Sequence, residues 1–291
     1  MKILITGANG QLGNEIKELA PAYSHYEFIY TDVNELDITN ATRVNAFFEQ
    51  HNPDVIINCA AYTAVDKAET DKETAFLVNA TASGILAQAA TDTGAFMVHV
   101  STDYVYDGRN FSPYHETDPV NPVSVYGKSK LAGEIAVQKA DGKAMIIRTS
   151  WLYSAFGNNF IKTMIKYGKE RDSLNVVFDQ IGTPTYARDL ANTILHILPV
   201  AMTAEDIEVY HYSNEGVASW YDFARAIHEI AEIKCQVNPI PTKEYPLPAE
   251  RPFYSVLDKG KIKKKFVIEI PYWRDSVKAC IERLEKVSNS E

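Results

Sequence analysis

The chain of 291 residues carries a formal net charge of −9, and 46% of its residues are hydrophobic. The length suits one large domain or two modest ones, and the apolar content suffices for a substantial core, which argues against disorder. The acidic balance argues against nucleic acid and membrane surfaces as partners, because both attract a basic face.

The cysteines and the amino terminus indicate a reducing compartment. Cys59, Cys235 and Cys280 are widely spaced and form no CxxC motif, so neither a disulfide framework nor a zinc site is expected. The first residues, MKILITGANG, contain an apolar run that is too short for a signal peptide or a membrane span. We therefore expect a cytoplasmic protein. The sequence also shows no clear carboxylate cluster, so we predict that no metal is required.

Short apolar runs alternate with helical patterns in the first half of the chain. The runs are rich in Ile and Val and nearly continuous, as buried parallel strands are. We predict strands at Lys2–Thr6, Glu27–Thr31, Asp54–Cys59, Phe96–Ser101 and Ala144–Thr149, and helices at Leu12–Leu19, Ala41–His51, Thr74–Thr91 and Tyr126–Lys139. Thr39 is the expected N-cap of the second helix. The alternation predicts a doubly wound parallel α/β sheet of the Rossmann type.

The pattern loosens after Trp151. We predict a strand at Leu174–Asp179 and helices at Asn158–Lys169, Arg188–Leu198, Trp220–Ile233 (capped by Ser219) and Asp275–Val287. Prolines between 239 and 252 indicate an irregular stretch, and the basic segment Lys259–Phe266 is expected to be a solvated face. We predict a dinucleotide-binding domain at 1–150 and a smaller α/β substrate domain at 151–291, with a return to the first domain near 180–200.

A glycine-rich loop, GANGQLG, follows the first strand and opens the first helix. Glycines there allow a tight turn and close approach of a pyrophosphate to the positive helix N-terminus. The spacing differs from the usual G-x-G-x-x-G, so a plain turn remains the alternative. The candidate cofactor-binding residues of the loop are Gly7, Gly10, Gln11, Leu12 and Gly13.

Five residues at the ends of the second and third strands are further candidates for the cofactor site. Asp32 lies about twenty residues after the loop, where an acid can hold the adenosine ribose. Its carboxylate would repel a 2′-phosphate and so favours NADH over NADPH; a turn aspartate is the alternative. Asp37, beside Ile38, could contact the adenine or help cap the next helix. Ala60 and Ala61 are small enough to pack against a cofactor.

Tyr126 and Lys130 stand one helical turn apart in NPVSVYGKSKLAGE. Free tyrosine ionises near about pH 10, and a lysine one turn away lowers that pKa by favouring the phenolate. Thr102, at the end of the fourth strand, could hydrogen-bond a substrate carbonyl. A lone Y-x-x-x-K is usually a solvated helix face. Together with Thr102 and the glycine loop, the pair predicts proton transfer that accompanies hydride transfer from a nicotinamide.

The chain resembles the extended short-chain dehydrogenase/reductase family. The resemblance spans nearly the whole chain and rests on GANGQLG, NCAAYTAVDKAE, VHVSTDYVYDG, NPVSVYGKSKLAGE, RTSWLY, GNNFIKTM, DQIGTPT, SNEGVASWYDFA and RPFYSVLD. It implies a Rossmann domain with a smaller nucleotide-sugar domain. It also implies reduction of the C4 ketone of dTDP-4-dehydro-L-rhamnose to dTDP-L-rhamnose, with NADH or NADPH as the reductant.

The resemblance also implies roles for individual residues. Tyr126 is the expected proton donor, Lys130 its partner and Thr102 the carbonyl anchor. The expected sugar-pocket residues are Asp103, Tyr104 and Trp151, and those near the nucleotide diphosphate are Asn159 and Arg251. A core aromatic is the alternative for Trp151, and a surface salt bridge is the alternative for Arg251.

Other functions on the same scaffold stay open. Tyr104 stands where related dehydratases carry a second acid, which disfavours dehydration. A non-catalytic nucleotide-binding regulatory subunit and a reductase of another 4-keto nucleotide sugar remain alternatives. We expect a small-molecule nucleotide sugar as the partner, neither nucleic acid nor membrane, and a monomer or a homodimer.

Overall fold

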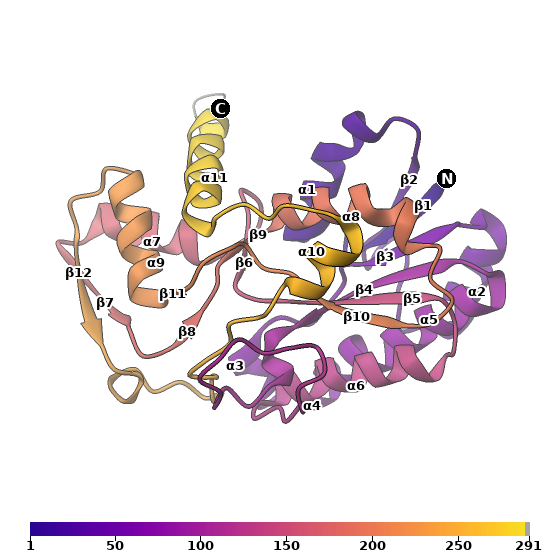
Figure 1. Ribbon diagram of the computed structural model, residues 1–291, viewed down its shortest axis with the longest axis horizontal. Coiled ribbons are helices and arrows are strands. Elements are labelled where there is room, and N and C mark those ends of the chain that lie inside the picture. The colour runs from indigo at the N-terminus through magenta and orange to yellow at the C-terminus, as the bar shows by residue number, and fades with distance from the viewer. Residues whose placement is uncertain (289–291) are drawn as a thin grey trace.

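A six-stranded sheet forms the centre of the larger lobe in the computed structural model of the chain, which describes residues 1–288 (Figure 1). Its strands are β1 (Lys2–Thr6), β2 (Glu27–Tyr30), β3 (Val55–Asn58), β4 (Phe96–Thr102), β5 (Ala144–Thr149) and β10 (Glu208–His211). They lie in the order β10-β5-β4-β3-β1-β2, and every neighbouring pair is parallel. The five predicted strands are confirmed within one residue at either end, and β10 was not predicted.

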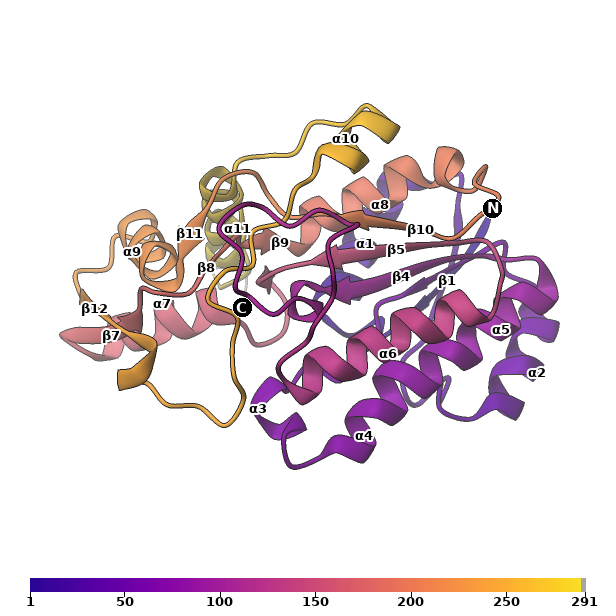
Figure 2. The ribbon, with the colours of Figure 1, turned by 60° about the horizontal axis from the view of Figure 1, so that its bottom comes forward.

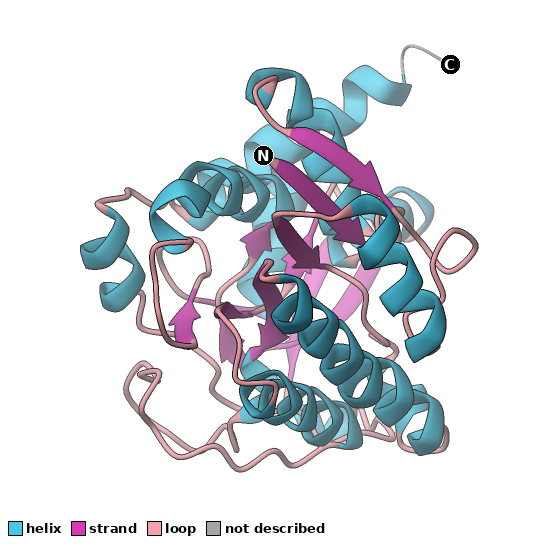
Figure 3. Cartoon of the chain, turned by 90° about the vertical axis from the view of Figure 1, so that its right-hand side faces the viewer, coloured by secondary structure: helices cyan, strands magenta, loops and turns pink. Residues whose placement is uncertain are grey.

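Helices cover both faces of this sheet, as Figures 2 and 3 show. One face carries α1 (Gln11–Leu19), α8 (Ala187–Ala201) and α10 (Gly260–Phe266); the other carries α2 (Ala41–His51), α5 (Ala82–Thr93) and α6 (Val125–Lys139). Because strand side chains alternate, Ile3 and Ile5 pack towards α1 and α8, whereas Leu4 packs towards the other layer. The doubly wound α/β fold is therefore confirmed.

The order of the strands reverses beside β1. From β1 the chain moves outward to β2, and then returns to place β3 on the other side of β1. A crevice at the carboxyl ends of the strands is expected at such a reversal, and ligands of open parallel sheets bind there. The glycine loop, which follows β1, lies at this point.

The smaller lobe lies beyond the carboxyl ends of the main strands (Figure 1). It contains α7 (Phe160–Glu170), α9 (Trp220–Ile230) and α11 (Trp273–Ser288), and the strand pairs β7 (Ser173–Val177) with β12 (Gln236–Ile240), β8 (Ile181–Gly182) with β11 (Ala218–Ser219), and β6 (Leu152–Tyr153) with β9 (Thr185–Tyr186). Its core is rich in buried aromatic residues, among them Tyr153, Phe223 and Trp273. The predicted cap at Ser219 is confirmed as a capping box with Asp222.

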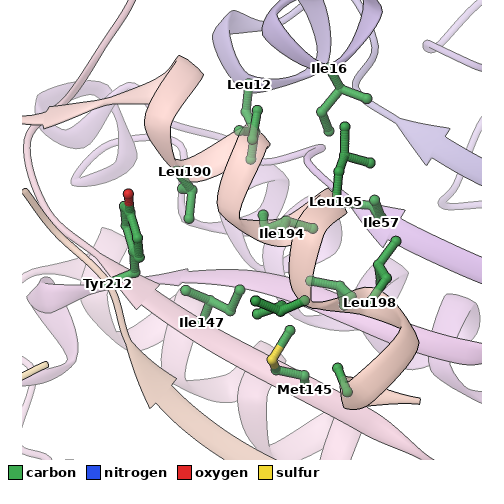
Figure 4. Packing of buried hydrophobic residues seen from close by; sticks show 14 of the residues in the cluster. Leu12, Ile16, Ile57, Met145, Ile147, Leu190, Ile194, Leu195, Leu198 and Tyr212 are labelled. Atoms are coloured by element: carbon green, nitrogen blue, oxygen red, sulfur yellow. The ribbon is translucent and has the colours of Figure 1, made fainter. Parts of the chain in front are cut away.

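Residues after 150 also contribute to the larger lobe. Leu190, Ile194 and Leu198 of α8 point towards Met145 and Ile147 of β5 (Figure 4). The strand β10 then extends the sheet beside β5. The division at residue 150 stays a prediction, and any such division has to accommodate this segment in the first lobe.

The predicted helix Thr74–Thr91 is confirmed as a helical stretch, but it is not regular throughout. The chain forms α4 (Lys72–Phe76), a π-helical turn at Leu77–Thr81 and then α5 without leaving helical conformation. Within the turn, the Asn79 side chain accepts from Tyr62 N at 2.8 Å and donates to Ser129 Oγ at 2.9 Å. Such bulges break the regular ladder where a side chain has a specific task, and periodicity alone does not reveal them.

Three smaller expectations are corrected. Asn40, not Thr39, caps α2, because its side chain accepts from Arg43 N. The proline-rich stretch is not wholly irregular, since its first part is β12, paired with β7. Lys259 is only 7% exposed, and its Nζ lies 3.4 Å from Oε2 of Glu215. The basic segment therefore does not form a uniformly solvated face.

The remaining short elements are the helix α3 (Val65–Ala68) and the 3-10 turns at Ala20–Tyr23, Asp103–Val105 and Thr242–Glu244. Within residues 1–288, no helix has the length and apolar character needed to cross a membrane.

Candidate active site

A cavity of about 580 Å³ opens between the two lobes at the carboxyl edge of the sheet. The glycine loop, the ends of β4 and β5 and the start of α6 form its walls in the larger lobe. Residues from the 150–159 segment and Trp220 close it from the smaller lobe. The predicted residues that line it are Gly10, Gln11, Leu12, Ala61, Thr102, Asp103, Tyr104, Tyr126, Lys130, Trp151 and Asn159.

The glycine loop is shaped by close backbone contacts. Gly7 has φ +62°, and a Cβ atom there would lie 2.7 Å from the Ala60 backbone. A Cβ atom on Gly13 would lie 2.5 Å from Ala8 Cα. Gly10 is the N-cap residue of α1 and offers no side-chain cap, so backbone N–H groups of the first turn are available to a phosphate. The loop therefore fits the pyrophosphate of a dinucleotide.

Asp32 lies against this loop. Its carboxylate accepts hydrogen bonds from Asn9 N at 3.0 Å and Val33 N at 2.8 Å, which fixes it beside the glycine turn. Asp37 instead accepts from the amide and hydroxyl of Thr39, and the hydroxyl bond lowers its pKa. Ile38 is buried in the hydrophobic core beneath α2. Neither Asp37 nor Ile38 lines the cavity, and their roles in cofactor binding stay predictions.

Thr102, Tyr126 and Lys130 come together on one wall. Thr102 Oγ1 donates to Asp103 Oδ1 at 3.0 Å, and Lys130 Nζ donates to Val100 O at 2.7 Å. Burial raises the pKa of Tyr126 to about 12, and the neighbouring Thr102 hydroxyl opposes the rise. Burial also lowers the pKa of Lys130 to about 8. The expectation that the pKa of Tyr126 would be lowered is wrong here, because desolvation of the phenolate raises it.

These values still suit a proton donor. A phenol with a raised pKa is protonated at neutral pH, and it remains a stronger acid than the alcohol formed when a ketone is reduced. Lys130 is still mostly protonated at neutral pH, and its positive charge lies one helical turn from Tyr126. The wall can therefore deliver a proton to a nascent alkoxide.

Helix α6 is held in place by groups that sequence reasoning missed. Ser124 caps its first turn by accepting from Gly127 N at 3.1 Å. A Cβ atom on Gly127 would lie 2.2 Å from Tyr104 O, so only glycine allows this approach of α6 to the end of β4. Asn79 secures the next turn through Ser129. Two sequence signals for these contacts were available, namely the serine before the helix and the glycine after Tyr126.

Asp103 is 1% exposed, and burial raises the pKa of its carboxyl to about 6, although the hydroxyls of Ser255 and Thr102 oppose the rise. At pH values between 3.8, the pKa of the unfolded chain, and about 6, the native Asp103 carboxyl holds a proton that the unfolded chain has lost. The contribution of this group to stability therefore increases as the pH falls through 6.

We expect Asp103→Asn to be more stable than wild type at pH 7, by at most about 3 kcal/mol, and to lose that advantage near pH 4. Urea unfolding of both proteins at each pH measures the difference, and a pH-independent difference would contradict the assignment.

Arg251 and Asn159 are already engaged with protein groups. Arg251 makes a bidentate pair with Asp66 of α3, at 2.9 and 2.8 Å, and lines a second cavity of about 280 Å³. Asn159 caps α7 through Lys162 N and donates to Gln11 Oε1 at 3.0 Å. Each residue therefore joins the two lobes, and its contact with a nucleotide diphosphate stays a proposal.

Trp220 is a site residue that the sequence analysis did not select. It lines both cavities, and its ring stacks on Trp151 with centroids 3.7 Å apart. The available signal was its place in SNEGVASWYDFA, directly after the Ser219 cap. Among residues 1–288, no group of three or more His, Cys, Asp or Glu side chains is arranged to hold a metal ion.

Comparison with known proteins extends over both lobes. The family model described as the RmlD substrate binding domain matches residues 1–286. A dTDP-4-dehydrorhamnose reductase of Burkholderia thailandensis is 43% identical over 297 residues, which cover 98% of this chain and 99% of that protein.

Two solved structures are similar over the same length. A dTDP-4-dehydrorhamnose reductase from Clostridium acetobutylicum has a TM-score of 0.92 and 46% identity, covering 98% of this chain and 100% of that one. A dTDP-4-dehydrorhamnose reductase from Bacillus anthracis, solved in complex with NADP, has a TM-score of 0.91 and 39% identity, covering 97% and 99%.

Proposed function

This chain belongs to the RmlD substrate binding domain family, and we propose that it reduces the C4 ketone of dTDP-4-dehydro-L-rhamnose to dTDP-L-rhamnose. In this proposal NADH or NADPH supplies the hydride and Tyr126 supplies the proton. One observation carries the proposal: Thr102, Tyr126 and Lys130 share a cavity with the glycine loop at the carboxyl edge of the sheet.

The wall of the cavity supports a simple division of tasks. A bound reduced nicotinamide supplies hydride to the carbonyl carbon. Thr102 orients the carbonyl oxygen by hydrogen bonding, and Tyr126 gives its phenol proton to that oxygen as negative charge develops there. Lys130 favours the phenolate that remains, because its positive charge lies one helical turn away.

The two cavities support a substrate with two distinct ends. The larger cavity, with Thr102 and Tyr126, is suited to the keto sugar, and the smaller one, with Arg251, is suited to the nucleotide. Trp220 lies in the lining of both, so they are neighbours. Two N–H groups of the Arg251 guanidinium remain for a phosphate beside those bound to Asp66 and Ala249.

The remaining site residues are part of the same proposal. Asp103, Tyr104 and Trp151 line the sugar end, and Gly7, Gly10, Gly13 and Asp32 surround the dinucleotide. Tyr104, in place of a second acid, supports reduction rather than elimination. We further propose a cytoplasmic location, consistent with three free cysteines, and a monomer or homodimer.

The direct test mixes purified protein with dTDP-4-dehydro-L-rhamnose and follows cofactor absorbance, with NADH and NADPH in parallel. Cofactor oxidation with dTDP-L-rhamnose as the product supports the proposal. A talose-configured product would preserve the mechanism but assign another 4-keto sugar reductase. Tight cofactor binding without any oxidation would favour the non-catalytic regulatory subunit.

A further inference from the structure

Trp151 has an unusual backbone conformation for a bulky residue. Its φ is +46°, in the left-handed region where residues with a Cβ atom are uncommon. Such a conformation persists only when surrounding contacts enforce it, and it often marks a functional site. Because Trp151 lines the larger cavity, the question is which contacts hold it there.

Two neighbours clamp the Trp151 indole. One face stacks on Trp220, with centroids 3.7 Å apart and planes inclined by 10°. Gly182 of β8 also lies against the ring: a Cβ atom there would be 2.7 Å from Cε2 of Trp151. The backbone is held as well, because Thr185 N donates to Trp151 O at 3.1 Å. The ring therefore packs against both an aromatic face and a glycine.

Trp220 is itself fixed. It is the first residue of α9 and lies between Ser219 and Asp222, the two residues of the capping box. Its ring lies 4.7 Å from the Phe160 ring at the start of α7. Two helix starts therefore determine where the Trp220 ring lies, and Trp220 can impose a position on Trp151.

We propose that Trp220 is a positioning residue that holds Trp151 in its left-handed conformation and forms, with it, an aromatic partition between the sugar end and the nucleotide end of the site. This inference rests on the proposed function. The partition suits a nucleoside diphosphate sugar. The faces of the two indoles can pack against the apolar faces of the sugar and the base, and the polar diphosphate can lie beside the edges of the indoles. Loss of the stack releases Trp151 and removes the wall against which the keto sugar lies.

Trp220→Leu and Trp220→Phe test the proposal, with Trp273→Phe as the matched control. Trp273 is also a buried aromatic of the smaller lobe, but it lines neither cavity. We expect Trp220→Leu to raise KM for the nucleotide sugar and lower kcat, so that kcat/KM falls by about tenfold or more. The dissociation constant for NADPH stays near wild type. Trp220→Phe recovers most of the loss because it keeps an aromatic face.

A spectroscopic measurement detects the stacking of Trp151 on Trp220 independently of catalysis. The near-ultraviolet circular dichroism band of the stacked indoles should disappear in both Trp220 variants and remain in Trp273→Phe. Wild-type kcat and KM in Trp220→Leu, with that band gone, would overturn the proposal. So would equal losses in Trp220→Phe and Trp220→Leu, since these indicate that only filled volume matters.

Failure of the proposed function would look different. Wild-type protein would then leave the 4-keto sugar unreduced, while the dichroism of the variants and their affinity for dTDP, measured by calorimetry, would still report on the partition. Weaker dTDP binding in Trp220→Leu than in Trp273→Phe supports the partition in that case, and equal binding contradicts it.

Discussion

Tyr126→Phe is expected to lower kcat for ketone reduction by roughly 10²- to 10⁴-fold, the range that a positioned general acid contributes. The substitution removes the only atom of the side chain that can give a proton, and it leaves the ring in place against Tyr104, 5.4 Å away between centroids. The glycine loop is untouched, so the dissociation constant for NADPH should stay near wild type. Stopped-flow absorbance and cofactor fluorescence measure the two quantities.

Tyr62→Phe is the matched control for this prediction. Tyr62 packs in the same small cluster as Tyr126, but its hydroxyl donates to Asp71 at 3.1 Å and it does not line the cavity. We expect this variant to keep its activity. Turnover in Tyr126→Phe that matches Tyr62→Phe would refute the role of Tyr126 as proton donor.

Arg148→Met is expected to destabilise the fold by about 3–5 kcal/mol, the cost of leaving a buried charge without its partner. Arg148 and Glu134 are 5% and 1% exposed, and the guanidinium holds both carboxylate oxygens, with Nη2 2.7 Å from Oε2. Arg148 also donates to Tyr106 Oη at 2.7 Å. Urea unfolding followed by tryptophan fluorescence measures the loss.

Two controls separate the buried pair from ordinary charge effects. Arg148→Met combined with Glu134→Leu removes both charges and should recover much of the lost stability. Lys143→Met breaks a surface pair with Glu205 and should cost no more than about 1 kcal/mol. A single Arg148→Met variant as stable as Lys143→Met would show that Glu134 tolerates burial alone.

The same pair connects the fold to the site. Glu134 is on α6, two turns after Tyr126, and Arg148 is on β5, beside the strand that ends in Thr102. Ser101 also donates to the Glu134 carboxylate. The pair therefore fixes the catalytic helix against the strand that presents Thr102, and none of these partners was selected from the sequence.

The sequence alone was enough to determine those elements that depend on residues close together along the chain. The continuous apolar run of β1, the capping box at Ser219 and the glycine loop are examples, because turn geometry, strand burial and helix capping depend on neighbours along the chain. The pair of Tyr126 and Lys130 was accessible in the same way, since one helical turn brings them to one face. Resemblance to a known family then supplied the candidate residues of the smaller lobe.

Only the tertiary structure decided the contacts between distant segments. Sequence spacing does not show that Arg251 meets Asp66, that Trp220 stacks on Trp151, or that β10 joins β5. The pKa of Tyr126 likewise depends on burial by the surrounding fold, which raises it. Local pattern thus specified which groups carry the chemistry, whereas long-range packing set their environment, because desolvation and ring stacking arise only when distant segments of the chain pack together.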